Sequence, residues 1–262
     1  MAVALKVSLV TAVLNRAGTI ADTLQSILDQ TYPDIECIIV DGESTDGTLD
    51  VIERFRPRFG ERLKVISEPD AGLYDAMNKG IRAASGDIVG FINSDDYYHD
   101  PTSIARIAFE FQNDRTIDAV YGDVHFVAAN DPKRITRYYS SRAFRLSRFR
   151  YGFMPAHPTF FTYRANYERF GYFKADYRIS GDFELLLRFL MVNKLKARYI
   201  NADLLTMRAG GISTASLRNT LLLNREVMRA CRENHIHTTY FHLYLRYFNK
   251  IFQFKWSALL HS

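Results

Sequence analysis

Cysteine is scarce in this sequence, and long hydrophobic runs are missing. The two cysteines, Cys37 and Cys231, lie far apart, which excludes a disulfide framework and a cysteine-rich metal site. No apolar stretch approaches the ~20 residues of a membrane-spanning helix. The first residues, MAVALKVSLVTAV, lack the charged start, long apolar core and cleavage site of a signal peptide. We therefore expect a protein of the reducing cytosol.

Charge is unevenly distributed along the chain. Residues 1–120 hold 11 Lys or Arg against 20 Asp or Glu, whereas residues 121–262 hold 23 against 9. Hydrophobic residues make up 47% of the 262 positions, enough for a sizeable core. Two interpretations of the basic half stay open: it contacts something anionic, or it is a solvated basic surface.

The first 120 residues alternate between strand and helix patterns. Buried-strand runs are predicted at 7–13, 35–40, 63–66 and 88–92, and helices at 19–28, 48–55 and 73–84. Asp100 and Pro101 then predict an N-cap and first turn of a further helix. Such repeated strand–helix units predict an α/β fold with a parallel, doubly wound sheet.

The pattern changes after residue 120. Strands are predicted at 120–127, 135–139 and 160–163, an extended segment at 197–207, and a helix at 182–192. Residues 214–256 read as two helices with a break near 235–239. We expect a catalytic domain at 1–212, divided into halves 1–120 and 121–212, and a basic, aromatic helical extension at 213–262.

Polar residues follow the predicted strands of the first half. They include Thr11, Asp41, the segment 68–70 and the segment 93–96. Ligands of open parallel sheets bind at the carboxyl ends of the strands. Because Asp100 is the better cap for the next helix, the adjacent Asp95 and Asp96 are free for another role. A divalent cation between them and another anion is favoured over simple solvation.

Three segments together resemble a known family. They are VSLVTAVLNR, SILDQTYPDIECIIVDGESTDGT and SEPDAGLYDAMNKGIRAASGDIVGFINSDD, which cover the first ~100 residues. In this order they resemble family 2 of the glycosyltransferases, and the third is similar to bacterial enzymes of exopolysaccharide and surface-glycan synthesis. The resemblance implies a GT-A (Rossmann-like) fold, with a mostly parallel sheet flanked by helices, and a nucleotide-sugar donor.

The resemblance also implies roles for individual residues. Asp96 would bind Mn²⁺ or Mg²⁺, which stabilises the leaving diphosphate. Asp41 would accept a hydrogen bond from the base, Thr11 and Val13 would lie against base and ribose, and Asn78 is favoured over Lys79 as a ribose or phosphate contact. The full set expected to contact the nucleotide-sugar is Thr11, Val13, Asp41, Asp70, Asn78, Lys79, Asn93, Ser94 and Asp95.

The general base is expected in the second half, in the segment ISGDFEL. The family resemblance favours Asp182, at the start of a helix, as the group that deprotonates the acceptor hydroxyl. Capping of that helix is the structural alternative for Asp182. Glu184 is the second choice, although two positions along a helix it should point elsewhere. His157 and Asp123 are weaker candidates for the acceptor side.

The C-terminal segment combines Lys and Arg with many aromatic residues. Phe241, Tyr244, Phe248 and Phe252 share a helical face, typical of a basic amphipathic helix at a membrane interface. Packing on the catalytic domain or on a second subunit, as in a homo-oligomer, is the alternative. Nucleic acid is a poorer partner, because no binding motif is present and the acidic half would repel phosphates.

The sequence thus predicts an inverting, metal-dependent glycosyltransferase with a nucleotide-sugar donor, most simply a UDP-sugar. The acceptor would be a hydroxyl of a glycan or lipid-linked glycan, in the cytoplasm or at the inner face of the plasma membrane. One alternative is a sugar nucleotidyltransferase, although residues 14–18 are a poor match to the glycine-rich basic loop of that class. The other is an inactive donor-binding or scaffold subunit, against which the intact carboxylates argue.

Overall fold

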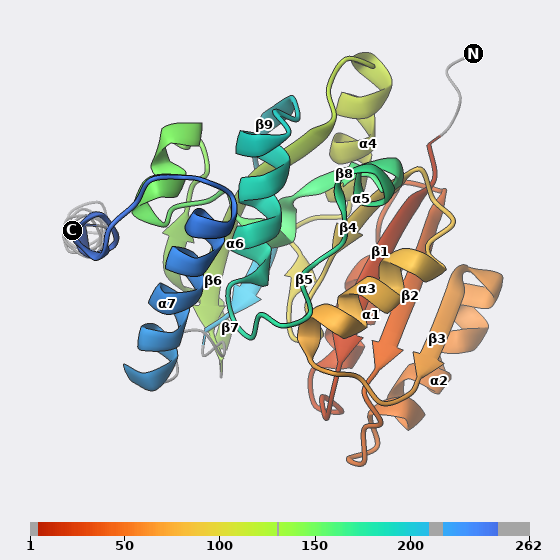
Figure 1. Ribbon diagram of the computed structural model, residues 1–262. Coiled ribbons are helices and arrows are strands. Elements are labelled where there is room, and N and C mark those ends of the chain that lie inside the picture. The colour runs from red at the N-terminus through yellow and green to blue at the C-terminus, as the bar shows by residue number, and fades with distance from the viewer. Residues whose placement is uncertain (1–4, 130, 210–216, 246–262) are drawn as a thin grey trace.

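The computed structural model describes residues 5–129, 131–209 and 217–245 (Figure 1). Within these residues one sheet of nine strands runs through the molecule in the order β3-β2-β1-β4-β8-β6-β9-β5, with β7 paired to β6. Helices lie on both sides of it, which confirms the α/β prediction.

The first half is built from parallel strand–helix units. Its elements are β1 (Val7–Val13), α1 (Ile20–Leu28), β2 (Ile35–Asp41), α2 (Thr48–Phe59), the 3₁₀ turn η1 (Gly60–Arg62), β3 (Leu63–Ser67), α3 (Leu73–Ala83) and β4 (Ile88–Phe91). Strands β1–β4 pair in parallel, and every residue of β2 and β4 is buried. Continuous apolar strands are typical of a sheet covered on both faces, as predicted.

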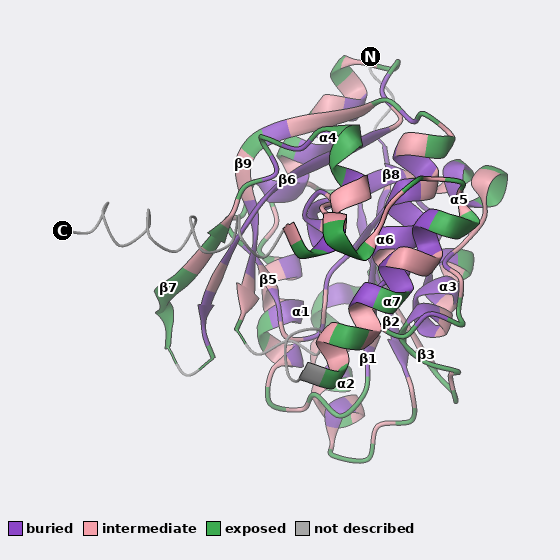
Figure 2. Ribbon diagram, turned by 60° about the vertical axis from the view of Figure 1, so that its left-hand side comes forward, coloured by how far each residue is buried: buried purple, intermediate pink, exposed green. Residues whose placement is uncertain are grey.

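The second half is more irregular. It contains β5 (Tyr97–Tyr98), α4 (Ser103–Asn113), β6 (Ala119–Ala128), β7 (Asp131–Tyr139), η2 (Leu146–Tyr151), η3 (His157–Thr159), β8 (Phe161–Tyr163), α5 (Arg164–Phe170), α6 (Gly181–Leu186), η4 (Leu187–Val192), β9 (Ala197–Arg208) and α7 (Leu217–Glu233). Strands β8, β7 and β5 join the sheet in antiparallel pairs, whereas β6 and β9 are parallel. Strand β7 is the exposed outer edge, as Figure 2 shows.

Alternate side chains of β1 enter two different cores. Leu9 packs with α1, α2 and α4 on one face of the sheet. Val10 packs with α3, α6 and α7 on the other face. Burying a large apolar side chain stabilises the fold by about 1.5–3 kcal/mol, so these two clusters hold the helices on their faces.

Helix α7 is not separate from the preceding domain. Its Val227, Ala230 and Cys231 are buried in the core that includes α6, and Leu243 of the following helical turn is buried there too. Residues 234–239 interrupt the helix, which confirms the predicted break. Of the predicted aromatic face, Phe241 and Tyr244 are exposed, and Phe248 and Phe252 lie outside the described residues.

Three local predictions differ from the structure. Helix α4 begins at Ser103, and Asp100 instead accepts hydrogen bonds from the main chain and hydroxyl of Thr102, at 2.7 and 2.6 Å. Helix α2 continues through Pro57 to Phe59. The predicted helix 182–192 is α-helical to Leu186 and then widens into a π-helical turn.

No helix in the described ranges is both long and apolar enough to cross a bilayer.

Candidate functional site

The carboxyl ends of β1–β4 bring two predicted donor residues together. Asp41, at the end of β2, is fully buried and accepts hydrogen bonds from the Ser44 main chain at 3.1 Å and the Ser67 hydroxyl at 2.8 Å. A Cβ placed on Gly42 would lie 2.5 Å from a carboxylate oxygen of Asp70, so glycine permits the close approach of that side chain. Asp41 and Asp70 thus border the same edge of the sheet.

Two loops at this edge are tied together in strained conformations. Asn15 and Glu43 have positive φ angles of 52° and 63°, which are uncommon for residues other than glycine. The Asn15 main chain donates to the Ser44 hydroxyl at 2.8 Å, and the Asn15 amide oxygen accepts from the Thr45 main chain at 2.9 Å. Strain held by such reciprocal bonds is typical of a ligand-binding edge.

The adjacent acidic pair after β4 differs strongly in burial. Asp96 is only 1% exposed, whereas Asp95 is partly exposed. Burial, together with the neighbouring Asp95, raises the pKa of Asp96 to about 7. The Asn93 amide donates to one Asp96 oxygen at 2.7 Å, and the Arg208 main chain to the other at 3.3 Å. A carboxylate oxygen has a second lone pair, so these bonds leave room for a cation.

A cavity of about 390 Å³ opens beside this pair. Arg16, Asp95 and Arg208 are among its lining residues. The Arg208 guanidinium donates to the Asp95 carbonyl at 3.1 Å and pairs with Asp22. Two arginines and a carboxylate around one cavity fit a diphosphate with a divalent cation. Arg208, at the end of β9, was not foreseen, because its sequence position gives no signal of the contact.

Three further donor candidates lie at the same edge but face inward. Thr11 and Val13 alternate with Ala12 along β1, and both are buried. The Thr11 hydroxyl has no hydrogen-bond partner among the described residues. Ser94 is 7% exposed, and its carbonyl accepts from the Thr19 hydroxyl at 2.9 Å, which fixes the loop that holds Asp95 and Asp96.

Helix α3 uses its two candidate residues structurally. Asn78 is buried, and its side-chain amide both donates to and accepts from the Phe173 main chain, at 2.8 and 2.9 Å. These bonds tie α3 to the segment before α6, and the contact of Asn78 with the donor stays a prediction. Lys79 pairs with Glu68 at 3.0 Å and donates to the Pro69 carbonyl. It thereby braces the loop before α3.

Asp182 lies at the start of α6, and its carboxylate has Tyr74 and His157 as neighbours. The Tyr74 hydroxyl is 3.5 Å from one of its oxygens, and Nδ1 of His157 is 3.8 Å from the other. Burial raises the pKa of Asp182, and His157 opposes this shift. Burial also lowers the pKa of His157, so the imidazole is more easily neutral. Ser180, not Asp182, is the N-cap residue of α6, but the Asp182 carboxylate accepts a hydrogen bond from the Phe183 main chain at 2.8 Å, so it also serves the first helical turn.

Glu184 is held very differently, only two residues along α6. Its carboxylate is fully buried and pairs with Arg188 and Lys174, both at 3.0 Å. Burial opposes its ionisation, but the two cations outweigh burial and hold the pKa of Glu184 below its usual value. A carboxylate paired with two cations is a poor proton acceptor, which favours Asp182 over Glu184 as the base.

Glu226 is a site residue that the sequence did not reveal. From α7 its carboxylate accepts three main-chain hydrogen bonds, from Arg178, Ile179 and Ser180, at 2.7–2.9 Å. These N–H groups lead into the first turn of α6, where a negative charge is favourable. The segment that carries Asp182 is therefore fixed by a residue more than 40 positions away.

Asp123 does not line an open acceptor pocket. Its carboxylate is 2% exposed and accepts hydrogen bonds from the Ser141 main chain and the side chains of Tyr138, Ser140 and Tyr199. Asp123 thus joins β6, β7 and β9. These bonds serve the fold, and an acceptor role of Asp123 stays a prediction.

Comparisons with known proteins agree with this geometry. The sequence profile described as Glycosyl transferase family 2 matches residues 8–170. The chain is 33% identical over 207 residues to a PGL/p-HBAD biosynthesis glycosyltransferase of Mycobacterium bovis, covering 79% of this chain and 78% of that one.

Solved structures share the fold. A fragment of S. aureus TarS in complex with UDP-GlcNAc has a TM-score of 0.67 at 20% identity, covering 86% of this chain and 66% of that one. A mannosyltransferase from Pyrobaculum calidifontis, in complex with GDP-Man and Mn²⁺, has a TM-score of 0.63 at 21% identity, with 86% and 64% covered. The chain spans 39% of a longer TarS chain.

The fold and the carboxylate-rich edge define a GT-A glycosyltransferase. The chain belongs to glycosyl transferase family 2, and it is an enzyme of glycan biosynthesis.

Proposed function

We propose that this enzyme is an inverting, metal-dependent glycosyltransferase that transfers a sugar from a UDP-sugar to a hydroxyl of a surface glycan or lipid-linked glycan. The observation that carries the proposal is Asp182, a largely buried carboxylate with a raised pKa that lies beside His157 and Tyr74. An inverting transfer needs one such base, on the face opposite the departing diphosphate.

Asp41 and the cavity beside Asp95 form the donor side of the proposal. Asp41 would accept the N–H of a uracil ring, since its buried carboxylate can take up a further donor. Arg16 and Arg208 would attract the diphosphate. The bound UDP-GlcNAc of TarS supports a uridine nucleotide, and the GDP-Man of the mannosyltransferase is the competing case.

Asp96 and Asp95 would hold the metal. Their oxygen ligands suit Mg²⁺ or Mn²⁺, and a cation would relieve the repulsion that raises the pKa of Asp96. When bound, the cation neutralises charge that develops on the leaving diphosphate. The Mn²⁺ in the mannosyltransferase complex supports this assignment.

Asp182 would take the proton of the acceptor hydroxyl as that oxygen attacks the anomeric carbon. Burial favours proton uptake by Asp182, and Glu226 fixes the segment that carries it. His157 would hold the Asp182 carboxylate in place through the oxygen that Tyr74 does not contact. Proton transfer to a placed base contributes roughly 10²–10⁴-fold to the rate.

The helical turn after residue 239 would bring the enzyme to its acceptor at the inner face of the membrane. Tyr240, Phe241 and Tyr244 are 47–71% exposed, although Leu243 between them is buried. Aromatic side chains of this kind insert at a lipid interface. Replacing Tyr240 and Phe241 by Ser should reduce sedimentation with anionic liposomes, and unchanged sedimentation would favour a packing role.

Titration calorimetry tests the central proposal. The full chain is titrated with UDP, GDP and dTDP, each with Mn²⁺ and with EDTA. We expect the tightest binding for UDP with Mn²⁺, and weaker binding for Asp41→Asn. Equal binding in EDTA would overturn the metal assignment. A lack of binding to all three nucleotides would favour a scaffold role.

A further inference from the structure

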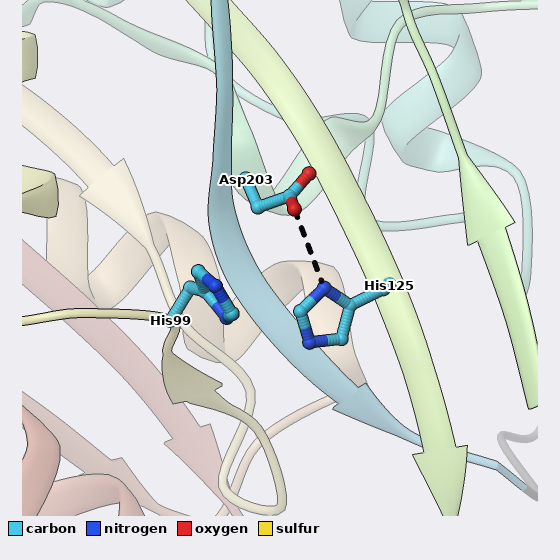
Figure 3. Close-up of side chains that lie close together, drawn as sticks. All are labelled: His99, His125 and Asp203. Carbon is cyan, nitrogen blue, oxygen red and sulfur yellow. Dashed lines mark ion pairs between the residues drawn. The ribbon is translucent and has the colours of Figure 1, made fainter. Parts of the chain in front are cut away.

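Two histidines and one aspartate from three neighbouring strands converge outside the donor edge. His99 follows β5, His125 lies in β6 and Asp203 lies in β9, as Figure 3 shows. One possible ligand atom from each residue lies within 4.8 Å of the other two. Strand β9 pairs with both β5 and β6, so the sheet itself sets this spacing.

The side chains of His99, His125 and Asp203 lie close together but form no hydrogen bonds with one another. Nδ1 of His125 is 3.7 Å from a carboxylate oxygen of Asp203, too long for a hydrogen bond. The other Asp203 oxygen is buried and has no hydrogen-bond partner among the described residues. Buried carboxylate oxygens are normally paired, so this orphaned atom points to an unfilled ligand position.

The Thr206 hydroxyl orients both rings. It lies 3.1 Å from Nε2 of His125 and 3.4 Å from Nδ1 of His99. Hydroxyl partners of this kind fix the ring orientation of metal-binding histidines.

We propose that His99, His125 and Asp203 form a second metal site, distinct from the donor site, which binds a divalent transition metal such as Zn²⁺. Two imidazoles and one carboxylate suit Zn²⁺, whereas the all-oxygen pair Asp95 and Asp96 suits Mg²⁺ or Mn²⁺. His99 is exposed, so solvent completes the coordination. The site does not depend on the activity proposed above.

Metal bound here would brace the sheet next to the donor edge. Asp203 and Arg208 share strand β9, and the Arg208 main chain contacts Asp96. His99 follows the same acidic pair by way of β5. A metal that joins β5, β6 and β9 therefore stabilises the strands on which the Asp96 loop depends.

Zinc binding to the metal-free, untagged full chain tests the proposal. We expect calorimetry at pH 7.5 to show one equivalent of Zn²⁺, with a rise in Tm, and Co²⁺ to give visible absorption bands of a nitrogen–oxygen site. His99→Ala and Asp203→Asn should each weaken Zn²⁺ binding by about 100-fold or more. His99 is exposed, so its replacement should leave folding intact.

Two matched variants locate the site. Asp96→Asn removes a ligand of the proposed donor metal, and His237→Ala removes an exposed histidine near the C-terminal helical turn. Both should keep the full Zn²⁺ affinity. The proposal is overturned if wild type does not bind Zn²⁺, if His99→Ala and Asp203→Asn bind as wild type does, or if Asp96→Asn alone abolishes binding. Failure of nucleotide binding would leave these outcomes unaffected.

Discussion

The two halves of the enzyme hold their functional carboxylates by different means. At the donor edge, Asp41 and Asp96 each accept a hydrogen bond from a loop residue three positions away, Ser44 and Asn93, and a second one from a distant strand end. At the acceptor side, Asp182 meets Tyr74 and His157, which are far from it along the chain.

This difference separates a site that follows from strand ends from a site that depends on the packing of distant elements. The donor edge follows from strand ends of a parallel sheet, which every strand–helix unit creates in the same place. The acceptor side exists only when α3, η3, α6 and α7 have packed into one core. Damage to long-range contacts should therefore affect transfer while donor binding persists.

The largest effect is expected for Asp182→Asn. Transfer should fall roughly 10²–10⁴-fold, because the amide cannot accept the acceptor proton, while UDP binding is retained. The folded-state pKa of Asp182 is raised, so its contribution to stability is full at low pH and lost as the pH rises through that pKa. At pH 8 the variant should therefore have a Tm equal to or above that of wild type. Asp176→Asn, at an exposed position, is the control.

The rate of Asp182→Asn is measured with a radiolabelled donor, and its Tm by calorimetry. Wild-type turnover by this variant would show that the acceptor proton leaves by another route.

Glu184→Gln should act in the opposite way, on stability instead of chemistry. Loss of the buried negative charge leaves Arg188 without its carboxylate partner, which destabilises the fold by about 3–5 kcal/mol, whereas Lys174 keeps its ion pair with Glu233. Turnover per folded molecule should stay near wild type. Urea unfolding measures the first quantity, and a rate corrected for folded fraction the second. A stable but inactive Glu184→Gln protein would make Glu184 the better candidate for the base.

Glu226→Gln should lower both the stability and the turnover, each by less than in the two variants above. The amide keeps one acceptor oxygen for three main-chain donors, so stability should fall by about 1–3 kcal/mol. Because the segment before Asp182 loosens, kcat should fall while the donor KM is unchanged. Arg232→Gln, at an exposed position of α7, serves as the control. A change in donor KM without a change in kcat would contradict a role in positioning Asp182.

The same contrast explains what the sequence could predict. Periodicity and strand-end motifs located β1–β4, Asp41 and Asp96, because each depends on residues close in sequence. The family resemblance located Asp182. The partners that give Asp182 its environment, above all Glu226, leave no local pattern. The structural bonds of Asn78 and Asp123 could not be predicted for the same reason, because their main-chain and tyrosine partners lie in distant segments. The cluster of His99, His125 and Asp203 likewise appears only after the strands pair.

The smallest expected effect tests the pairing of Asp182 with His157. Transfer needs ionised Asp182, so the rate should fall as the pH drops through its raised pKa. His157 opposes that rise in the pKa, across 3.8 Å. His157→Gln should therefore move the acid limb of the kcat–pH profile to higher pH, while the plateau changes little. His237→Gln, at an exposed position, should leave the profile unchanged. If His157 has only a structural role, its replacement should lower Tm without moving the acid limb. Measuring the pH profile and Tm on the same protein therefore distinguishes an electrostatic role from a structural one.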